Sequence, residues 1–208
     1  MDMDMRMDKG MKRFFWSLPI AALFLCWFAQ GAMAEPYWHA PTLLVFPDRL
    51  AGLEKKEVHD FESSLPGLGV SVAYVASGMK VNLYLYTQGR KEIPANLGLP
   101  EIIDHFAQIV ADVTRAVAAG AYESVQKTAE GKIPMDPMDP PGAGQREALS
   151  AKFDIVQGGQ ALRSRLYLTV FKGHFLKIRV TYDDKNTNLH EGQLNQLLGE
   201  LATMLRGP

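Results

Sequence analysis

Basic side chains alternate with apolar ones along two segments near the end of the sequence, and they are the residues best suited to hold another molecule. In the pairing that we expect between these segments, one tyrosine and four cations share a side: Arg163, Arg165, Tyr167, Lys177 and Arg179. Guanidinium and ammonium groups bind carboxylates and phosphates and also pack over aromatic rings. We therefore predict a binding surface here. The alternative is an ordinary solvated sheet face, on which long basic side chains are common.

No residue pattern in the chain predicts a catalytic site, a metal site or a cofactor. The five histidines lie at neither His-x-His nor His-Glu-x-x-His spacing, and the sequence has no Gly-x-Ser-x-Gly motif or phosphate-cradling glycine loop. The sequence therefore favours a non-catalytic binding or accessory protein. The alternative is a small hydrolase or transferase whose residues converge only in the fold. A concave pocket that holds His59, His105 or paired carboxylates would favour the enzyme, and a flat basic and aromatic sheet face would favour the binding protein.

Residues 1–34 have the pattern of a cleavable signal peptide. The cations Lys12 and Arg13 precede an uncharged apolar run over residues 14–29, and Ala32-Met33-Ala34 fits the small-x-small cleavage pattern. This pattern predicts that the protein is exported.

Cleavage is expected before Glu35, which leaves residues 35–208 as a single domain in the periplasm or outside the cell. Met11 is a second candidate for the start of the chain. An uncleaved membrane anchor is one alternative, although the apolar run contains Pro19 and is shorter than the roughly 20 residues of a spanning helix. A lipoprotein acylated at Cys26 is another. Because Cys26 is the only cysteine, the exported domain would be free of cysteine, which agrees with an oxidising compartment.

Composition and charge limit the classes of partner. The 208 residues are 47% hydrophobic, which is enough for a globular domain with a core. The formal net charge of -1 gives no general attraction to nucleic acid or to anionic membranes. We therefore expect the partner to be another cell-envelope protein or an anionic small ligand, and we expect no binding to nucleic acid. Contact with a membrane is expected only if the leader stays uncleaved, in which case the protein would be a membrane-anchored structural protein of the envelope.

Strands are expected early in the domain. Residues 35–42 read as an arm that packs late or not at all, and residues 43–46 and 55–61 as strands. Alternating apolar residues on both sides of Ser77-Gly78 predict a hairpin. A two-residue loop aligns the apolar side chains on one face in three pairs: Tyr74 with Val81, Val72 with Leu83, and Val70 with Leu85. Tyr84 and Tyr86 would then lie exposed on the outer face.

Two amphipathic helices are expected. The first begins at Pro100 and ends near Gly120 or near Ser124, and the second is capped by Asn188, with Glu191 completing a capping box. Between the helices, residues 133–144 read as a proline-rich loop and residues 151–156 as a strand.

The candidate binding residues lie on a second hairpin, whose register depends on its loop. A three-residue loop at Lys172-Gly173-His174 places Leu176 opposite Val170 and keeps the apolar residues together, whereas a two-residue loop would place it opposite Thr169 and mix the faces. We predict the three-residue loop, which also sets Tyr167 opposite Arg179. The fold class is therefore α+β: an antiparallel β-sheet with two amphipathic helices packed on its apolar face.

The order of these elements resembles that of the PsbP/Mog1-like proteins, several of which are exported or lumenal. The segment Leu65-Pro66-Gly67-Leu68-Gly69-Val70-Ser71-Val72-Ala73-Tyr74 is also similar to a segment that leads into a strand in small exported bacterial proteins. The resemblance covers most of residues 35–208 and implies an antiparallel sheet with helices packed on it. It implies no functional residue, because function varies widely within one fold.

Overall fold

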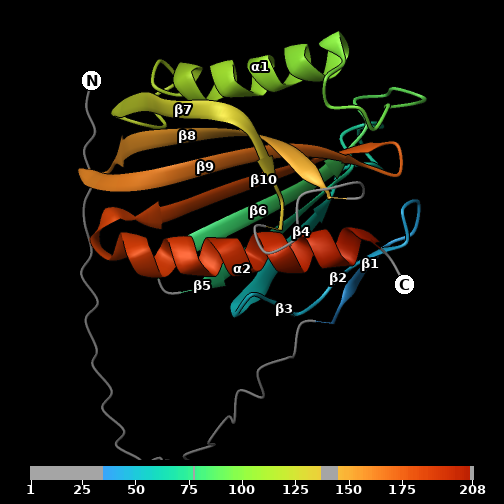
Figure 1. The fold of residues 1–208 in the computed structure, drawn as a ribbon, viewed down its shortest axis with the longest axis horizontal. Coiled ribbons are helices and arrows are strands. Elements are labelled where there is room, and N and C mark those ends of the chain that lie inside the picture. The colour runs from blue at the N-terminus through green and yellow to red at the C-terminus, as the bar shows by residue number, and fades with distance from the viewer. Residues whose placement is uncertain (1–34, 77, 137–144, 207–208) are drawn as a thin grey trace, which may run out of the picture. The chain divides into compact units, whose positions relative to one another are not determined.

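One antiparallel sheet of eight strands organises the computed structural model, which describes residues 35–76, 78–136 and 145–206. The expected leader with Cys26, and Ser77 of the first hairpin loop, lie outside the described residues. The strand order across the sheet is β3-β4-β5-β6-β10-β9-β8-β7 (Figure 1). The strands are β3 (Arg49–Leu50), β4 (Leu53–Asp60), β5 (Val70–Ala76), β6 (Met79–Tyr86), β7 (Ser124–Pro134), β8 (Glu147–Gln157), β9 (Gln160–Phe171) and β10 (His174–Asp183). The α+β fold with an antiparallel sheet is therefore confirmed.

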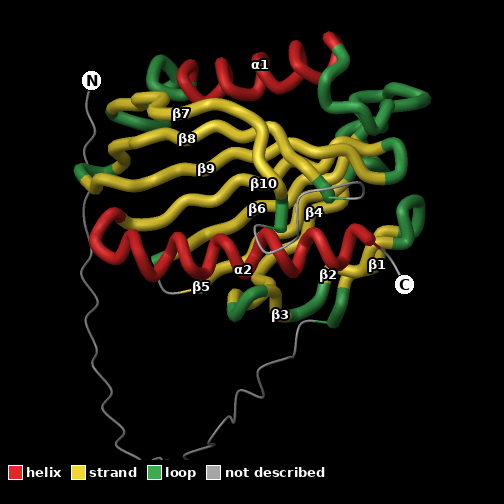
Figure 2. The backbone as a smooth tube through the Cα atoms, in the orientation of Figure 1, coloured by secondary structure: helices red, strands yellow, loops and turns green. Residues whose placement is uncertain are grey.

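Two long helices pack on this sheet, but on opposite faces, whereas the sequence led us to expect both on one face (Figures 1 and 2). Helix α1 (Pro100–Arg115) buries one stripe in a core that includes Phe175. Helix α2 (Thr187–Arg206) packs in a second core that includes Leu176. Since neighbouring residues of a strand point to opposite faces, these two residues of β10 assign the helices to different faces.

No helix in the described ranges is both long and apolar enough to cross a membrane.

The first hairpin has the predicted register. Tyr74 lies opposite Val81, Val72 opposite Leu83, and Val70 opposite Leu85. The apolar side chains of both strands face α2 and are fully or almost fully buried, so a slip by one residue would move the whole set to the other face of the sheet. The expectation that Tyr84 and Tyr86 are exposed is wrong, because α1 covers their face: Tyr86 is 7% exposed and Tyr84 is half-buried.

The second hairpin has the other register, and the predicted three-residue loop is wrong. Leu176 lies opposite Thr169, and His174 opposite Phe171. The loop is therefore the pair Lys172-Gly173, which has φ angles of +46° and +73°. Two consecutive positive φ values are typical of a type I′ turn, whose twist suits a tight hairpin. This register places apolar residues of the hairpin on both faces of the sheet, which was the argument against it. Both sets are nevertheless buried, because a helix covers each face.

Other strands, among them β1 and β7, also differ from expectation. The N-terminal arm is ordered: β1 (Tyr37–His39) pairs with β2 (Leu44–Phe46) in a separate two-stranded sheet, and His39 is only 8% exposed. Strand β7 was not predicted at all. It is an edge strand whose side chains are mostly exposed, so it lacks the apolar alternation that marks the inner strands.

The start of α2 also differs from the predicted cap. A 3-10 turn, η1 (Asp184–Asn186), leads directly into the helix, so Asn188 lies inside the helix rather than at its cap. The side chain of Asp183 caps the turn by accepting a hydrogen bond from the amide of Lys185. Glu191 takes no part in a capping box and instead contacts the sheet.

Candidate functional site

The five predicted binding residues do not share a face of the sheet. Because the hairpin register differs by one residue, Arg163, Arg165 and Tyr167 lie on the α2 face, and Lys177 and Arg179 lie on the α1 face. The two groups are therefore separated by the sheet itself.

The three residues on the α2 face are held by neighbouring parts of the fold. Arg165 is 6% exposed and pairs with Glu191 of α2. Arg163 donates to Asp154 and to Asp184, each at 2.6 Å, and so links β8 to η1. Tyr167 is 3% exposed within the core under α2. These contacts join the sheet to α2 and leave no open cationic surface at these positions.

Lys177 and Arg179 instead line a cleft between α1 and the sheet, which we call the α1 cleft. It consists of two adjoining cavities, of about 280 and 160 Å³, that share four lining residues: Tyr84, Ile109, Asp112 and Lys177. The larger cavity is completed by Phe61, Leu68, Tyr86, Gln88 and His105. The smaller one is completed by Val113, Ala116, Tyr122, Leu166 and Arg179.

The ammonium of Lys177 is the central charge of the α1 cleft. Its Nζ lies 4.1 Å from the centre of the Tyr84 ring and 5.7 Å from that of Tyr86. Burial, and secondarily the nearby Arg179, lower the pKa of Lys177. No ion pair between described residues includes Lys177. A half-buried cation that contacts aromatic rings rather than a carboxylate is an unusual arrangement, because even partial burial of an unpaired charge is costly.

Arg179 is fixed beside Lys177 by neutral groups. Its Nε donates to the Ser164 hydroxyl at 2.9 Å, and its Nη2 donates to the Tyr122 hydroxyl at 3.2 Å. The two cations are two residues apart on one face of β10, which corresponds to about 7 Å along the strand. Since neither contact is with a carboxylate, the charge of Arg179 adds to that of Lys177 inside the cleft. Burial raises the pKa of the Tyr84 phenol, so this ring stays neutral.

A hydrogen bond between the sheet and α1 closes one end of the cleft. The hydroxyl of Tyr86 lies 2.8 Å from Nε2 of His105, which is only 3% exposed. Burial lowers the pKa of His105 to about 4, and the positive charges of Arg90 and Lys177 act in the same direction. The imidazole is therefore neutral at pH 7. Its Nδ1 is buried and has no hydrogen-bond partner among the described residues.

Asp112 supplies the negative charge at the rim of the cleft. It lies on α1, is exposed, and forms an ion pair with Arg115 one turn further along the helix. Asp112 lines both cavities, so it faces the same space as Lys177 without pairing with it.

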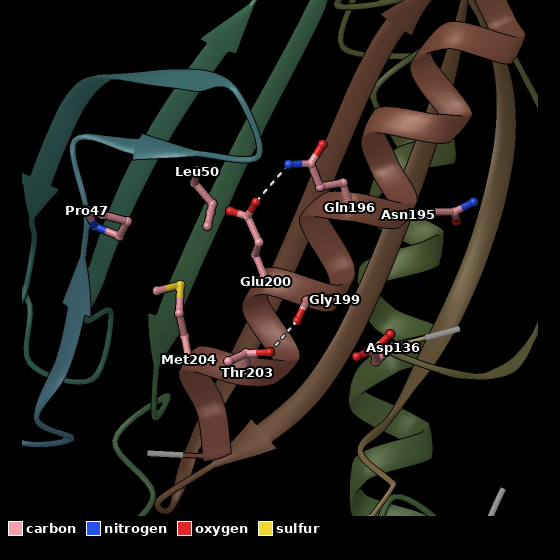
Figure 3. Close-up of a pocket in the computed structure, with 9 residues that line it drawn as sticks. All are labelled: Pro47, Leu50, Asp136, Asn195, Gln196, Gly199, Glu200, Thr203 and Met204. Carbon is pink, nitrogen blue, oxygen red and sulfur yellow. Dashed lines mark hydrogen bonds between the residues drawn. The ribbon is translucent and has the colours of Figure 1, made fainter. Parts of the chain in front are cut away.

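A larger cavity, of about 720 Å³, lies beside α2 and the residues around β3 (Figure 3). Most of its polar side chains already have partners within the protein. The Glu200 carboxylate accepts from the Ala51 amide at 2.7 Å and from Gln196 at 2.9 Å, and Asp136 lies 3.6 Å from Arg206. Most of the remaining lining is apolar, so this cavity offers less to recognise a charged ligand than the α1 cleft does.

Metal binding has no support in the described ranges, where no three His, Cys, Asp or Glu side chains come together at ligating distance.

Sequence reasoning identified Lys177 and Arg179 as candidate binding residues but missed the groups that complete their site. Tyr84 comes from β6, Asp112 from α1, and Tyr122 from the loop after α1. The pairing of β6 with β10, strands that are far apart in the sequence, places Tyr84 beside Lys177. The packing of α1 on this face of the sheet brings in Asp112 and Tyr122. The alternation of Tyr84 and Tyr86 with apolar residues was a usable signal. Two aromatic rings on the second face of this strand indicate that a helix covers that face as well.

No protein-family model matches the chain, and no curated protein matches its sequence. The solved structures that are similar in fold include the following two. The solution structure of CyanoP, the cyanobacterial PsbP of Synechocystis sp. PCC 6803, is 11% identical, covers 79% of this chain and 89% of its own, and has a TM-score of 0.49. The crystal structure of a protein of unknown function from Pseudomonas aeruginosa is 13% identical, covers 79% and 92%, and has a TM-score of 0.40. The structure thus has the predicted resemblance to a PsbP-like protein. The resemblance assigns no role to any residue of this chain.

Proposed function

We propose that this chain is an exported, non-catalytic binding protein that holds a small anionic ligand in the α1 cleft. The observation that carries the proposal is Lys177, a half-buried ammonium with aromatic contacts and no ion-pair partner among the described residues. An anion that enters the cleft would supply the missing counter-charge, and a charge-assisted hydrogen bond to a partly buried ammonium is stronger than one in open water.

The neighbouring groups support an anionic ligand rather than a cationic one. Arg179 adds a second positive charge, and the hydroxyl of Tyr84 stays protonated, so it can donate a hydrogen bond to an acceptor. Asp112 opposes an anion, but it is exposed and its charge is balanced by Arg115. The balance of charge inside the cleft is therefore positive.

An enzymatic role has one observation in its favour, since the cleft is concave and His105 lines it. A general base must present a free nitrogen to the substrate. In His105, Nε2 is bound to the Tyr86 hydroxyl and Nδ1 is buried. The single carboxylate in the lining, Asp112, is exposed and ion-paired, so the cleft has no pair of carboxylates. Binding is the activity that this arrangement supports better.

The experiment is an NMR titration of the ¹⁵N-labelled full chain with sodium acetate and with sodium phosphate at constant ionic strength. We expect amide shifts around Lys177 on β6, β10 and α1, and we expect Lys177→Met to abolish them. Lys80→Met is the matched control, because Lys80 is an exposed lysine of β6 outside the cleft. Shifts that spread over the surface, or that persist in folded Lys177→Met, would overturn the proposal.

A further inference from the structure

The α1 cleft has an apolar mouth as well as a cationic interior. Phe61 and Leu68 line the same cavity as Lys177, and their side chains are 38% and 49% exposed. Large apolar groups that are exposed at the opening of a charged cavity are a common feature of sites for ligands with an apolar body.

The loop that carries these two residues is fixed in place rather than loosely attached. The Glu62 carboxylate accepts hydrogen bonds from the amides of Gly67 and Gly69, and the Phe61 amide donates to the Gly69 carbonyl at 2.9 Å. The loop backbone therefore holds Phe61 and Leu68 at the mouth before any ligand arrives, which lowers the entropic cost of binding.

The charges of the cleft suit one negative charge better than two. Lys177 is the cation that has neither an ion pair nor a hydrogen bond among the described residues, whereas Arg179 already donates to Ser164 and Tyr122. With Lys177 and Arg179 against Asp112, the lining of the cleft carries a net charge of +1. A monoanion neutralises this charge, whereas a dianion leaves a negative charge without a partner inside the cleft.

Building on the proposed function, we infer that the ligand is an amphipathic monoanion: a carboxylic acid whose carboxylate contacts Lys177 and whose aromatic or branched apolar body lies between Tyr86 and the mouth formed by Phe61 and Leu68. Ile109 and the face of Tyr84 supply further apolar contact in the same cavity. The volume of about 280 Å³ is enough for a body of one or two rings.

Three probes separate the two parts of this inference when each is titrated into the full chain. They are 1-naphthoate, the neutral analogue 1-naphthalenemethanol, and acetate. We expect 1-naphthoate to bind at least about tenfold more tightly than acetate, equivalent to about 1.4 kcal/mol. Lys177→Met should weaken 1-naphthoate about tenfold and leave the alcohol unchanged.

Substitutions in the loop test the apolar mouth. Leu68→Ser should weaken 1-naphthoate about three- to tenfold without changing acetate binding. Leu65→Ser is the matched control, because Leu65 is 57% exposed on the same loop but does not line the cavity. A variant that does not give a native spectrum is replaced by Lys177→Gln or Leu68→Thr.

The outcomes distinguish the inference from the proposed function. If acetate and 1-naphthoate bind equally at Lys177, and Leu68→Ser changes neither, the cleft binds anions but the amphipathic ligand class is wrong. If the alcohol binds as tightly as 1-naphthoate and Lys177→Met has no effect, the anionic ligand is wrong and with it the proposed function. If no probe shifts the residues of the cleft, both are wrong.

Discussion

The guanidinium of Arg165 on β9 donates to the carboxylate of Glu191 on α2, with 2.6 Å between Nη2 and Oε1. The hydroxyl of Tyr182 donates to the same oxygen, and the Arg165 guanidinium also lies over the Tyr182 ring, 5.4 Å from its centre. Burial opposes the ionisation of Glu191, but the hydrogen bonds from Tyr182 and Arg165 outweigh it and lower the pKa of the carboxyl. The pair therefore fixes the first turns of α2 to the sheet.

Removing the carboxylate of Glu191 should leave Arg165 as a buried cation without a counter-charge. We expect Glu191→Gln to lower the free energy of unfolding by about 2 to 4 kcal/mol. Arg165→Met should cost less, since Glu191 can turn toward solvent. Urea unfolding of both variants and of the double mutant measures the coupling. Glu147→Gln, which removes an exposed pair with Lys132, is the control. A loss in Glu191→Gln no larger than in this control would contradict the structural role.

The stability of the fold should depend on the protonation of His105. Its pKa is lowered to about 4 in the folded chain, against about 6.5 in an unfolded one, so the unfolded chain binds more protons between these values. The contribution of His105 is complete above pH 6.5 and is lost as the pH falls toward 4. We expect a loss on the order of 1 to 3 kcal/mol over this range.

Urea unfolding from pH 4 to pH 7 measures this dependence. His105→Phe should flatten the slope, and His59→Gln, which changes an exposed histidine, should not. Burial and the neighbouring His174 lower the pKa of His39 as well, so a smaller slope of the same sign should remain. An unchanged slope in His105→Phe would show that the pKa of His105 is the same in the folded chain as in the unfolded one.

Gly69 holds the loop at the cleft mouth close to β6. It has a φ of +63°, and a Cβ at this position would overlap the carbonyl oxygen of Leu85. Gly69→Ala should therefore destabilise the fold by about 3 kcal/mol or more. Gly158 has a similar φ of +58° with no atom near the Cβ position, so Gly158→Ala should cost only about 1 to 2 kcal/mol. Equal losses in urea unfolding would mean that the loop can move away from β6.

Asp112 should oppose binding in the α1 cleft. Asp112→Asn removes a negative charge from the rim and releases Arg115, so we expect the affinity for 1-naphthoate to rise about threefold at low salt and the gain to shrink as salt is added. Asp104→Asn is the control, because Asp104 is exposed on α1 outside the cleft. A lower affinity in Asp112→Asn would mean that Asp112 holds Lys177 in its binding position.

Export can be tested on the full chain by determining the N-terminus and the cell fraction of the recovered protein. We expect a periplasmic or secreted protein that begins at Glu35, because Ala32-Met33-Ala34 fits a cleavage pattern. Recovery of the leader in a membrane fraction would favour the anchor instead. An acylated N-terminus at Cys26 would favour the lipoprotein.

The sequence predicted the elements well wherever one face of a strand is apolar and the other polar. The pairing of Tyr74 with Val81 followed from this contrast. The same reasoning failed on the second hairpin, because Leu168 and Ile178 are both fully buried but on opposite faces. The alternation predicted within each strand was correct. It does not determine the register between two strands when a helix covers each face of the sheet, because both faces then carry apolar residues.

The candidate site was predicted only in part, because alternation within a strand was read correctly and the register between strands was not. Lys177 and Arg179 lie together as the alternation along β10 required, whereas Arg165 was placed beside them only by the wrong register. The alternation of Tyr84 with apolar residues could not by itself place its ring beside Lys177, because that contact depends on the pairing of β6 with β10, which are separated in the sequence by α1 and three strands.

The two cores have consequences for how the protein unfolds, because β9 and β10 contribute side chains to both of them. Neither helix can detach without exposing the back of strands that the other helix still covers. The domain should therefore lose both cores in one cooperative transition, and the amide protons of β9 and β10 should exchange with solvent more slowly than those of the edge strand β7. A ligand held under α1 would then slow proton exchange beneath α2 as well, although the sheet lies between them.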